Sequence, residues 1–222
     1  MYQLHLYHNL YEGERLFIIG TGPSLLKIPT PLLKQLRDEY TFGVNLIAKT
    51  NLPFVPTMLA VMISEWHWIN DKGLDWMIKE IKGARKDLPP LLFYAHEKKV
   101  PELSENGWQF VPCLLGKEMS SGKFEGLGVS FPFVIFGYSV ILAAVQMACW
   151  MGFNPIYLLG CDATDKGHAY EEVKELDERR DQTYFRLSAG IAETRMREAG
   201  RSLIDLTEGG QLPVTQGSLA RA

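Results

Sequence analysis

Short apolar runs rich in β-branched and aromatic residues alternate along the chain with longer amphipathic or charged stretches. The first run ends in glycine, as a buried strand does before a sharp turn. The predicted strands are residues 15–20, 41–46, 58–64, 90–94, 108–112, 155–160 and 202–206. Because helical stretches separate them, the pattern predicts an α/β fold built on a doubly wound, mostly parallel sheet with helices on both faces.

Four helices are predicted between these strands. Thr30 as N-cap before Pro31 predicts a helix that continues to about Asp38. Residues 66–82 have an amphipathic pattern, and residues 171–199 are rich in charges of alternating sign, as in a solvated outer helix. The fourth, residues 136–151, is almost entirely apolar.

The chain has no Asp, Glu, Lys, Arg or His from Gly126 to Cys161. Pro132, Gly137 and Pro155 interrupt this run, and its longest predicted helix is shorter than the roughly 20 residues that a bilayer requires. We therefore expect no transmembrane segment here. The run is interpreted instead as a buried helix followed by a buried strand.

Composition and charge limit the kinds of protein that this chain can be. The 222 residues carry a net charge of −3 with 22% charged residues, which fits a single domain over residues 1–222 and lacks the basic surface of a nucleic-acid binder. Residues 1–13 do not have the pattern of a signal peptide. Three widely spaced cysteines without a CxxC motif predict reduced core thiols in a cytoplasmic protein. The glycine-rich residues 114–132 are interpreted as a lid loop.

The turn after the first strand is a candidate anion site. Its sequence, Gly20-Thr21-Gly22-Pro23-Ser24, allows backbone N–H groups to converge on a phosphate, although a purely structural turn is an equal alternative. Leu25 replaces the third glycine of the dinucleotide fingerprint, and no Gly-Lys-Ser/Thr follows. These differences disfavour both NAD binding and Walker-type ATP hydrolysis.

A second candidate site follows the sixth predicted strand. Residues 160–170 combine Asp162, Thr164, His168 and Tyr170, and histidine titrates near neutral pH while tyrosine can donate to a leaving oxyanion. A plain polar surface loop is the alternative. Asp162 with Asp165 allows a Mg²⁺ site, although no DxD motif supports it. Two residues after the third strand, Glu65 and His67, are candidates to line the same crevice.

Residues 9–25, 140–162 and 206–212 together resemble the MptE-like family of uncharacterised bacterial and archaeal proteins. The first two blocks are similar, more distantly, to bacterial lipooligosaccharide sialyltransferases. The resemblance implies a nucleotide-binding, Rossmann-like fold. It also implies a transferase that uses a CMP-sugar or another nucleotide-sugar for surface glycan synthesis. Through the archaeal namesake, it alternatively implies a Mg²⁺-dependent 6-hydroxymethylpterin diphosphokinase that uses ATP.

The resemblance also implies roles for single residues. The turn from Gly20 to Ser24 would hold the nucleotide phosphate, Asn45 would contact the nucleotide, and Gly160 with Asp162 would contact the nucleoside. Tyr170 matches a tyrosine that steadies the departing phosphate.

Four features of the sialyltransferases are altered or missing. Thr164 replaces a second leaving-group tyrosine, and Thr21 replaces the asparagine of their glycine turn. Gly137 stands where they have an arginine, and the segment with their catalytic histidine is missing. His168 is therefore the candidate base.

The expected function is a nucleotide-binding, metal-independent transferase without a firmly implied cofactor. A CMP-type nucleotide would enter as part of the donor, and the partners would be this nucleotide-activated small molecule and a glycan or other hydroxyl acceptor. Nucleic acid is not expected. A homo-oligomer, a peripheral location at the inner membrane face and a non-catalytic nucleotide-binding protein remain open alternatives.

Overall fold

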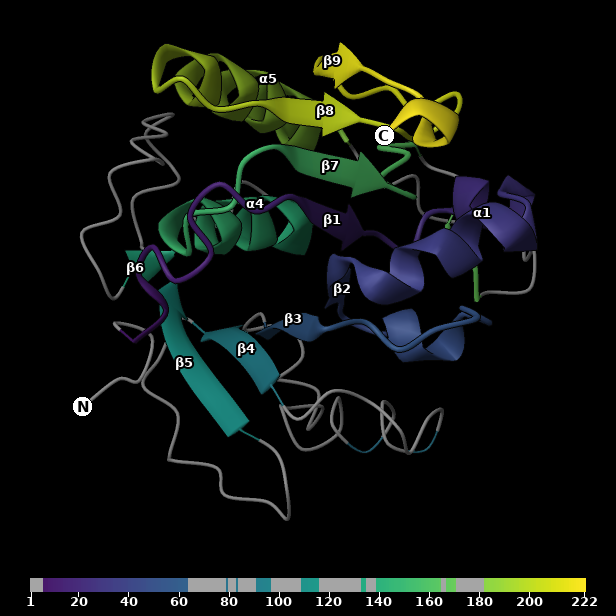
Figure 1. Ribbon diagram of the computed structural model, residues 1–222, viewed down its shortest axis with the longest axis horizontal. Coiled ribbons are helices and arrows are strands. Elements are labelled where there is room, and N and C mark those ends of the chain that lie inside the picture. Colours follow the sequence, from purple (N-terminus) through teal and green to yellow (C-terminus); the bar gives the residue numbers. More distant parts are fainter. Residues whose placement is uncertain are drawn as a thin grey trace.

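The computed structural model describes residues 6–63, 79, 83, 91–96, 109–115, 133–134, 139–164, 167–170 and 182–222. Within these ranges nine strands form one sheet in the order β6-β5-β4-β3-β2-β1-β7-β8-β9 (Figure 1). Every strand pairing is parallel. The predicted α/β fold with a parallel sheet is therefore confirmed.

All seven predicted strands are present, with ends shifted by a few residues. They are β1 (Leu16–Ile19), β2 (Tyr40–Val44), β3 (Met58–Ile63), β4 (Leu91–His96), β5 (Gln109–Leu115), β7 (Ile156–Leu159) and β8 (Leu203–Asp205). Two further strands, β6 (Phe133–Val134) and β9 (Thr215–Gln216), were not predicted. A pair of residues is too short to produce a periodic pattern, so only pairing with a neighbouring strand defines them.

The helices differ from the prediction mainly at their ends. Helix α4 (Val140–Trp150) begins at the Ser139 cap, whose hydroxyl accepts a hydrogen bond from the Ile141 N–H group at 3.3 Å. Helix α5 (Thr183–Glu198) lies within the long charged stretch. The prediction that Thr30 is an N-cap was wrong, because Thr30 is the first residue of α1 (Thr30–Gln35) and Pro29 precedes it as the cap.

Four short 3₁₀ helices complete the described elements. They are η2 (Pro23–Lys27), η3 (Leu36–Asp38), η4 (Ile47–Lys49) and η6 (Leu219–Arg221). The first of them follows β1 directly and so belongs to the candidate phosphate turn. The predicted helix of residues 66–82 and the lid loop of residues 114–132 fall outside the described residues, apart from residue 79 and the end of β5.

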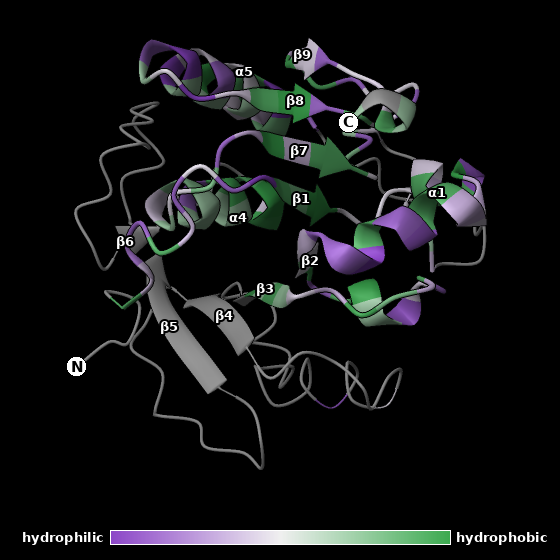
Figure 2. Ribbon diagram, in the orientation of Figure 1, coloured by the Kyte–Doolittle hydropathy of each residue, from purple (hydrophilic) through white to green (hydrophobic). Residues whose placement is uncertain are grey.

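Each face of the sheet has its own apolar core. Leu16 and Ile18 of β1 face α4 and α5, while Phe17 and Ile19 face η2 and the α1 region. Figure 2 shows the result: β1 and β7 are hydrophobic, whereas α1 and α5 carry hydrophilic segments. This alternation follows from the two-residue period of a strand and explains why central parallel strands are apolar on both faces.

The uncharged run is a core helix and a core strand. The α4 side chains from Val140 to Cys149 are all buried. No helix in the described part of the chain is long and apolar enough to cross a membrane. Burial raises the pKa of Cys149 to about 12 and that of Cys161 well above its usual value. Both thiols are free, as predicted for core cysteines.

The order of the strands places a topological switch point beside β1. From β1 the chain passes through α1 to β2 on one side, whereas β7 lies on the other side and leads through α5 to β8. The connecting helices α1 and α5 therefore pack on opposite faces of the sheet, and the chain diverges between the carboxyl ends of β1 and β7. Ligands of doubly wound proteins bind at such a point.

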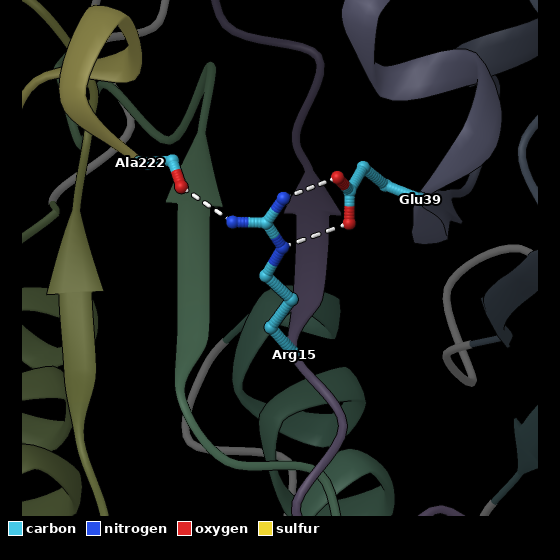
Figure 3. A network of polar contacts seen from close by, with 3 residues as sticks. All are labelled: Arg15, Glu39 and Ala222. Atoms are coloured by element: carbon cyan, nitrogen blue, oxygen red, sulfur yellow. Dashed lines mark hydrogen bonds and ion pairs between the residues drawn. The ribbon is translucent and has the colours of Figure 1, made fainter.

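Arg15 ties the start of β1 to two distant segments (Figure 3). Its guanidinium donates two hydrogen bonds to the Glu39 carboxylate, just before β2, and one to the carbonyl oxygen of Ala222. Arg15 is 43% exposed, so water screens this contact and its contribution to stability is small. The hydrogen bond to Ala222 places the last residues of the chain beside the start of β1.

Candidate functional site

The turns that follow β1 and β7 are joined by backbone hydrogen bonds. The Gly20 N–H group donates to the Leu159 carbonyl at 2.7 Å, and the Gly22 N–H group donates to the Gly160 carbonyl at 2.8 Å. Gly160 has a φ of +66°, a conformation that favours glycine. The two predicted sites are therefore one continuous structure at the switch point.

Glycine at positions 20 and 22 permits this close approach. A Cβ atom on Gly20 would lie 2.4 Å from the Gly160 carbonyl oxygen, and one on Gly22 would lie 1.9 Å from Oδ2 of Asp162. Any side chain would thus push the two turns apart. The glycines have a packing role here, which is compatible with a binding role for the same turn.

Asp162 and Ser24 connect the two turns through their side chains. The Ser24 hydroxyl donates to Oδ2 of Asp162 at 2.6 Å, and the Ser24 N–H group donates to Oδ1 at 3.1 Å. The carboxylate thus occupies the beginning of η2, where a phosphate was expected. Ser24 and Asp162 were both candidate ligand-binding residues in the sequence. In the structure they bind each other.

Thr21 connects the β1 turn to the loop after β7. Its Oγ1 lies 2.8 Å from Nδ1 of His168, and its carbonyl accepts a hydrogen bond from the Ala169 N–H group at 2.7 Å. The His168 ring stacks on Tyr170 with ring centroids 5.2 Å apart and an angle of 7° between the planes. The contact with Thr21 thereby places the imidazole beside the glycine turn, and Tyr170 stacks on this imidazole.

Asn45 stands at the same edge of the sheet. It follows β2, the neighbour of β1, and has a φ of +46°. Its N–H group donates to the Ala60 carbonyl of β3 at 2.8 Å. Asparagine adopts this left-handed conformation more readily than most residues. The residue therefore follows the end of β2, at the same edge of the sheet as the carboxyl end of β1.

A third turn, after β8, supports the site. Its role was not predicted from the sequence. The Cys161 N–H group donates to Oγ1 of Thr207 at 3.0 Å, and the Thr207 N–H group donates to Oδ1 of Asp205 at 2.9 Å. Asp205 is fully buried, and its Oδ2 accepts from Nε2 of Gln216 at 3.3 Å. An acidic residue inside the apolar run of residues 202–206 was the signal that could have revealed it.

Burial raises the pKa of Asp205 above its ordinary value of 3.8, and the nearby Asp162 acts in the same direction. A carboxyl group with a raised pKa in the folded state stabilises the fold below its unfolded pKa, and this contribution is lost as pH rises through the folded value. Asp205→Asn removes that titration. We expect the unfolding free energy of the variant, relative to that of the wild type, to increase as pH rises through the pKa of Asp205 in the folded state. Urea unfolding at several pH values measures this difference.

The exposed Asp38→Asn variant is the matched control for loss of one carboxylate. A difference between Asp205→Asn and the wild type that stays constant with pH would contradict a titration at Asp205. A difference of the opposite sign would mean that the ionised form is the better stabilised one.

Two buried polar atoms in this region have no hydrogen-bond partner in the described structure: Oγ1 of Thr164 and Nε of Arg186. Arg186 lies in α5, and its Nη1 donates to Oε1 of Gln211 at 2.9 Å. The Gln211 N–H group in turn donates to the Asp162 carbonyl at 3.1 Å. Thr164 follows Asp162 by two residues, so both atoms belong to the surroundings of Asp162.

Metal binding gains no support from the described ranges. No group of three His, Cys, Asp or Glu side chains there is arranged to hold an ion. Asp165, which would share a Mg²⁺ with Asp162, is outside the described residues, as are Glu65 and His67. These three stay sequence predictions.

The fold is similar to that of two solved glycosyltransferases. The MAf glycosyltransferase from Magnetospirillum magneticum AMB-1 matches 99% of this chain with a TM-score of 0.64 and 13% identity. The sialyltransferase CstII from Campylobacter jejuni, solved with the substrate analogue cytidine-5'-monophosphate, matches 94% of this chain with a TM-score of 0.54 and 14% identity. The chain therefore has a glycosyltransferase-like α/β fold.

The extent of these similarities differs. This chain spans 38% of the length of the MAf glycosyltransferase and 86% of that of CstII. No family model and no curated protein matches the sequence. At such low identity the similarity extends to the fold, and any shared activity is a matter for proposal.

Proposed function

We propose that the protein is a glycosyltransferase that transfers a sugar from a nucleotide-sugar, with a CMP-sugar as the first candidate, to a hydroxyl group of a glycan acceptor. The candidate residues surround the topological switch point, where this class of fold binds its ligands. The similarity to CstII, which was solved with a cytidine nucleotide, supports a CMP-type donor. In this proposal the product contributes to surface glycans.

The observation that carries the proposal is the 2.8 Å contact between Thr21 Oγ1 and His168 Nδ1. When Nδ1–H donates to Thr21, the lone pair of the imidazole is on Nε2, and Nε2 is then the basic atom. The contact with Thr21 holds the orientation of the ring, and the tautomer with the proton on Nδ1 is the one in which Nε2 can act as a base. A histidine fixed beside the glycine turn is suited to general base catalysis.

The proposed reaction is a displacement at the anomeric carbon of the donor sugar. The acceptor hydroxyl gives its proton to Nε2 of His168 while its oxygen forms a bond to the anomeric carbon. The bond from that carbon to the phosphate oxygen breaks, and its electron pair stays on the phosphate. Tyr170 and Thr164 would donate hydrogen bonds to the departing nucleotide, whose added negative charge strengthens them.

The meeting of His168 with the β1 turn also favours an enzyme over a non-catalytic nucleotide-binding protein. A base must approach its substrate to about 3 Å, which requires that the base and the binding turn lie together. Thr21 and His168, separated by 147 positions in the chain, meet this requirement. Membership in the MptE-like family remains part of the proposal, because it rests on short motifs alone.

A ligand panel tests the proposal. The wild-type protein is heated with CMP, cytidine, UDP, GDP or ATP, each with and without Mg²⁺, and its melting temperature is recorded. A ligand at 100 times its Kd adds about 2.7 kcal/mol of stability, which corresponds to roughly 5–10 °C for a chain of this size. We expect a shift of this order with CMP that does not depend on Mg²⁺.

Other results would redirect the assignment. A shift with ATP that requires Mg²⁺ would contradict the proposal and support the diphosphokinase. A shift with UDP or GDP alone would retain the glycosyltransferase and change the donor class. If no nucleotide shifts the melting temperature, the proposed function is wrong.

A further inference from the structure

Arg186 is an unassigned cation connected to the candidate site. It belongs to the first turns of α5, whose beginning lies toward the carboxyl end of the sheet because the chain runs from there back to β8. Nη1 of Arg186 donates to the Gln211 side chain, and the Gln211 N–H group donates to the Asp162 carbonyl. One residue thus separates the guanidinium from Asp162.

The hydrogen bonding of Arg186 is incomplete. Its Nε is buried and has no acceptor among the described residues, and the buried hydroxyl of Thr164 also lacks a partner there. A buried donor without an acceptor destabilises the folded state, so native proteins leave few of them. The described residues therefore leave the hydrogen bonding of the guanidinium incomplete.

Within the part of the chain that the structure describes, the charge of Arg186 is less compensated than that of two neighbouring arginines on α5. Arg195 pairs with the Glu198 carboxylate at 3.2 Å, and Arg197 pairs with Glu193 at 3.1 Å. The described partner of Arg186 is a neutral amide. A guanidinium that is partly buried against a neutral acceptor retains a strong attraction for an anion.

The candidate site needs such a cation. Asp162 and the buried Asp205 contribute acidic groups at this edge, and the turn from Gly20 to Ser24 has no basic side chain. The Ser24 N–H group of that turn is occupied by Asp162. A phosphate bound here would therefore depend on a positive charge from another element, and α5 provides one.

We propose that Arg186 binds the phosphate of the donor nucleotide through its guanidinium, with Gln211 as the support that orients this group. This inference rests on the proposed function, since it assigns a residue to the phosphate of the same nucleotide. As the sugar leaves, the phosphate oxygen gains negative charge, and the guanidinium would stabilise it.

Calorimetric titration with CMP and with cytidine tests this role, because the two differ only by the phosphate. Arg186→Gln is expected to weaken CMP binding by about tenfold or more, the effect of losing a charge-assisted hydrogen bond, while changing the Kd of cytidine less than twofold. Arg195→Gln is the matched control on the same helix. Its side chain is 57% exposed, and CMP should bind to it as to the wild type.

Arg186→Lys provides a second variant if the glutamine variant does not fold. Lysine keeps the charge but lacks the planar fork, so it cannot hold Gln211 and a phosphate together, and CMP binding should weaken several-fold with cytidine unaffected. An equal loss for CMP and cytidine, or no loss of CMP binding, in a folded variant would overturn the inference. If wild-type protein binds no nucleotide, the proposed function itself fails, and the inference with it.

Discussion

Replacing His168 with alanine should lower kcat for sugar transfer by about 10²–10⁴-fold while leaving the Kd of CMP nearly unchanged. The loss is the contribution of a positioned general base. Binding persists because the turns after β1 and β7 are joined by backbone hydrogen bonds and by the Ser24–Asp162 contact, none of which involves this imidazole. Initial rates with any accepted donor, together with calorimetric titration of CMP, separate the two effects.

Variants at two other positions make this test specific. Thr21→Val removes the hydroxyl that holds His168 Nδ1 and should lower kcat by a smaller factor, whereas Thr21→Ser should recover most of it. His8→Ala removes a histidine whose ring packs on Trp150, at the opposite edge of the sheet, and should turn over like the wild type. Unchanged turnover in His168→Ala would remove this residue from the mechanism.

Gly22→Ala should both destabilise the protein and abolish nucleotide binding. The backbone of Gly22, with φ −68° and ψ 153°, is open to alanine, so the cost is purely steric. The new methyl group would overlap the Asp162 carboxylate and the Gly160 carbonyl. Overpacking of this kind costs about 1–3 kcal/mol, or roughly 2–12 °C in melting temperature.

Gly83→Ala is the matched control, since a Cβ atom there would meet nothing within 4 Å. Its melting temperature and CMP affinity should stay close to those of the wild type. If Gly22→Ala melted and bound CMP like Gly83→Ala, the close contact between the two turns would not be needed for the site. Thermal melts and CMP titrations of both variants give the answer.

The strands and the class of fold were predictable because their signal is local. A run such as residues 155–160 is apolar on both faces and bounded by proline and glycine, which is enough to identify a central strand of a parallel sheet. The first residue of α4, after the Ser139 cap, and the two-residue strands were harder to predict from the sequence. They depend on a single hydrogen bond or on a neighbouring strand, and neither leaves a periodic pattern.

The candidate site was predictable as a set of residues but not as a set of contacts. Gly20–Ser24 and the loop after β7 were identified because parallel strands bring their carboxyl ends to one edge. That Ser24 holds Asp162, and that Thr21 holds His168, could not be inferred, since these pairs are 138 and 147 positions apart. Whether these residues act on a nucleotide-sugar stays a prediction until the ligand panel is done.

The sequence alone determined the alternation of strands and helices, the buried character of the uncharged run and the position of polar residues at the strand ends. These properties arise from hydrophobic period and turn chemistry within a few neighbouring residues. Only the tertiary structure decided the strand order, the buried Asp205–Thr207 support and the link from Asp162 through Gln211 to Arg186. Such contacts join residues that are distant along the chain, and they form only when the sheet and its helices pack.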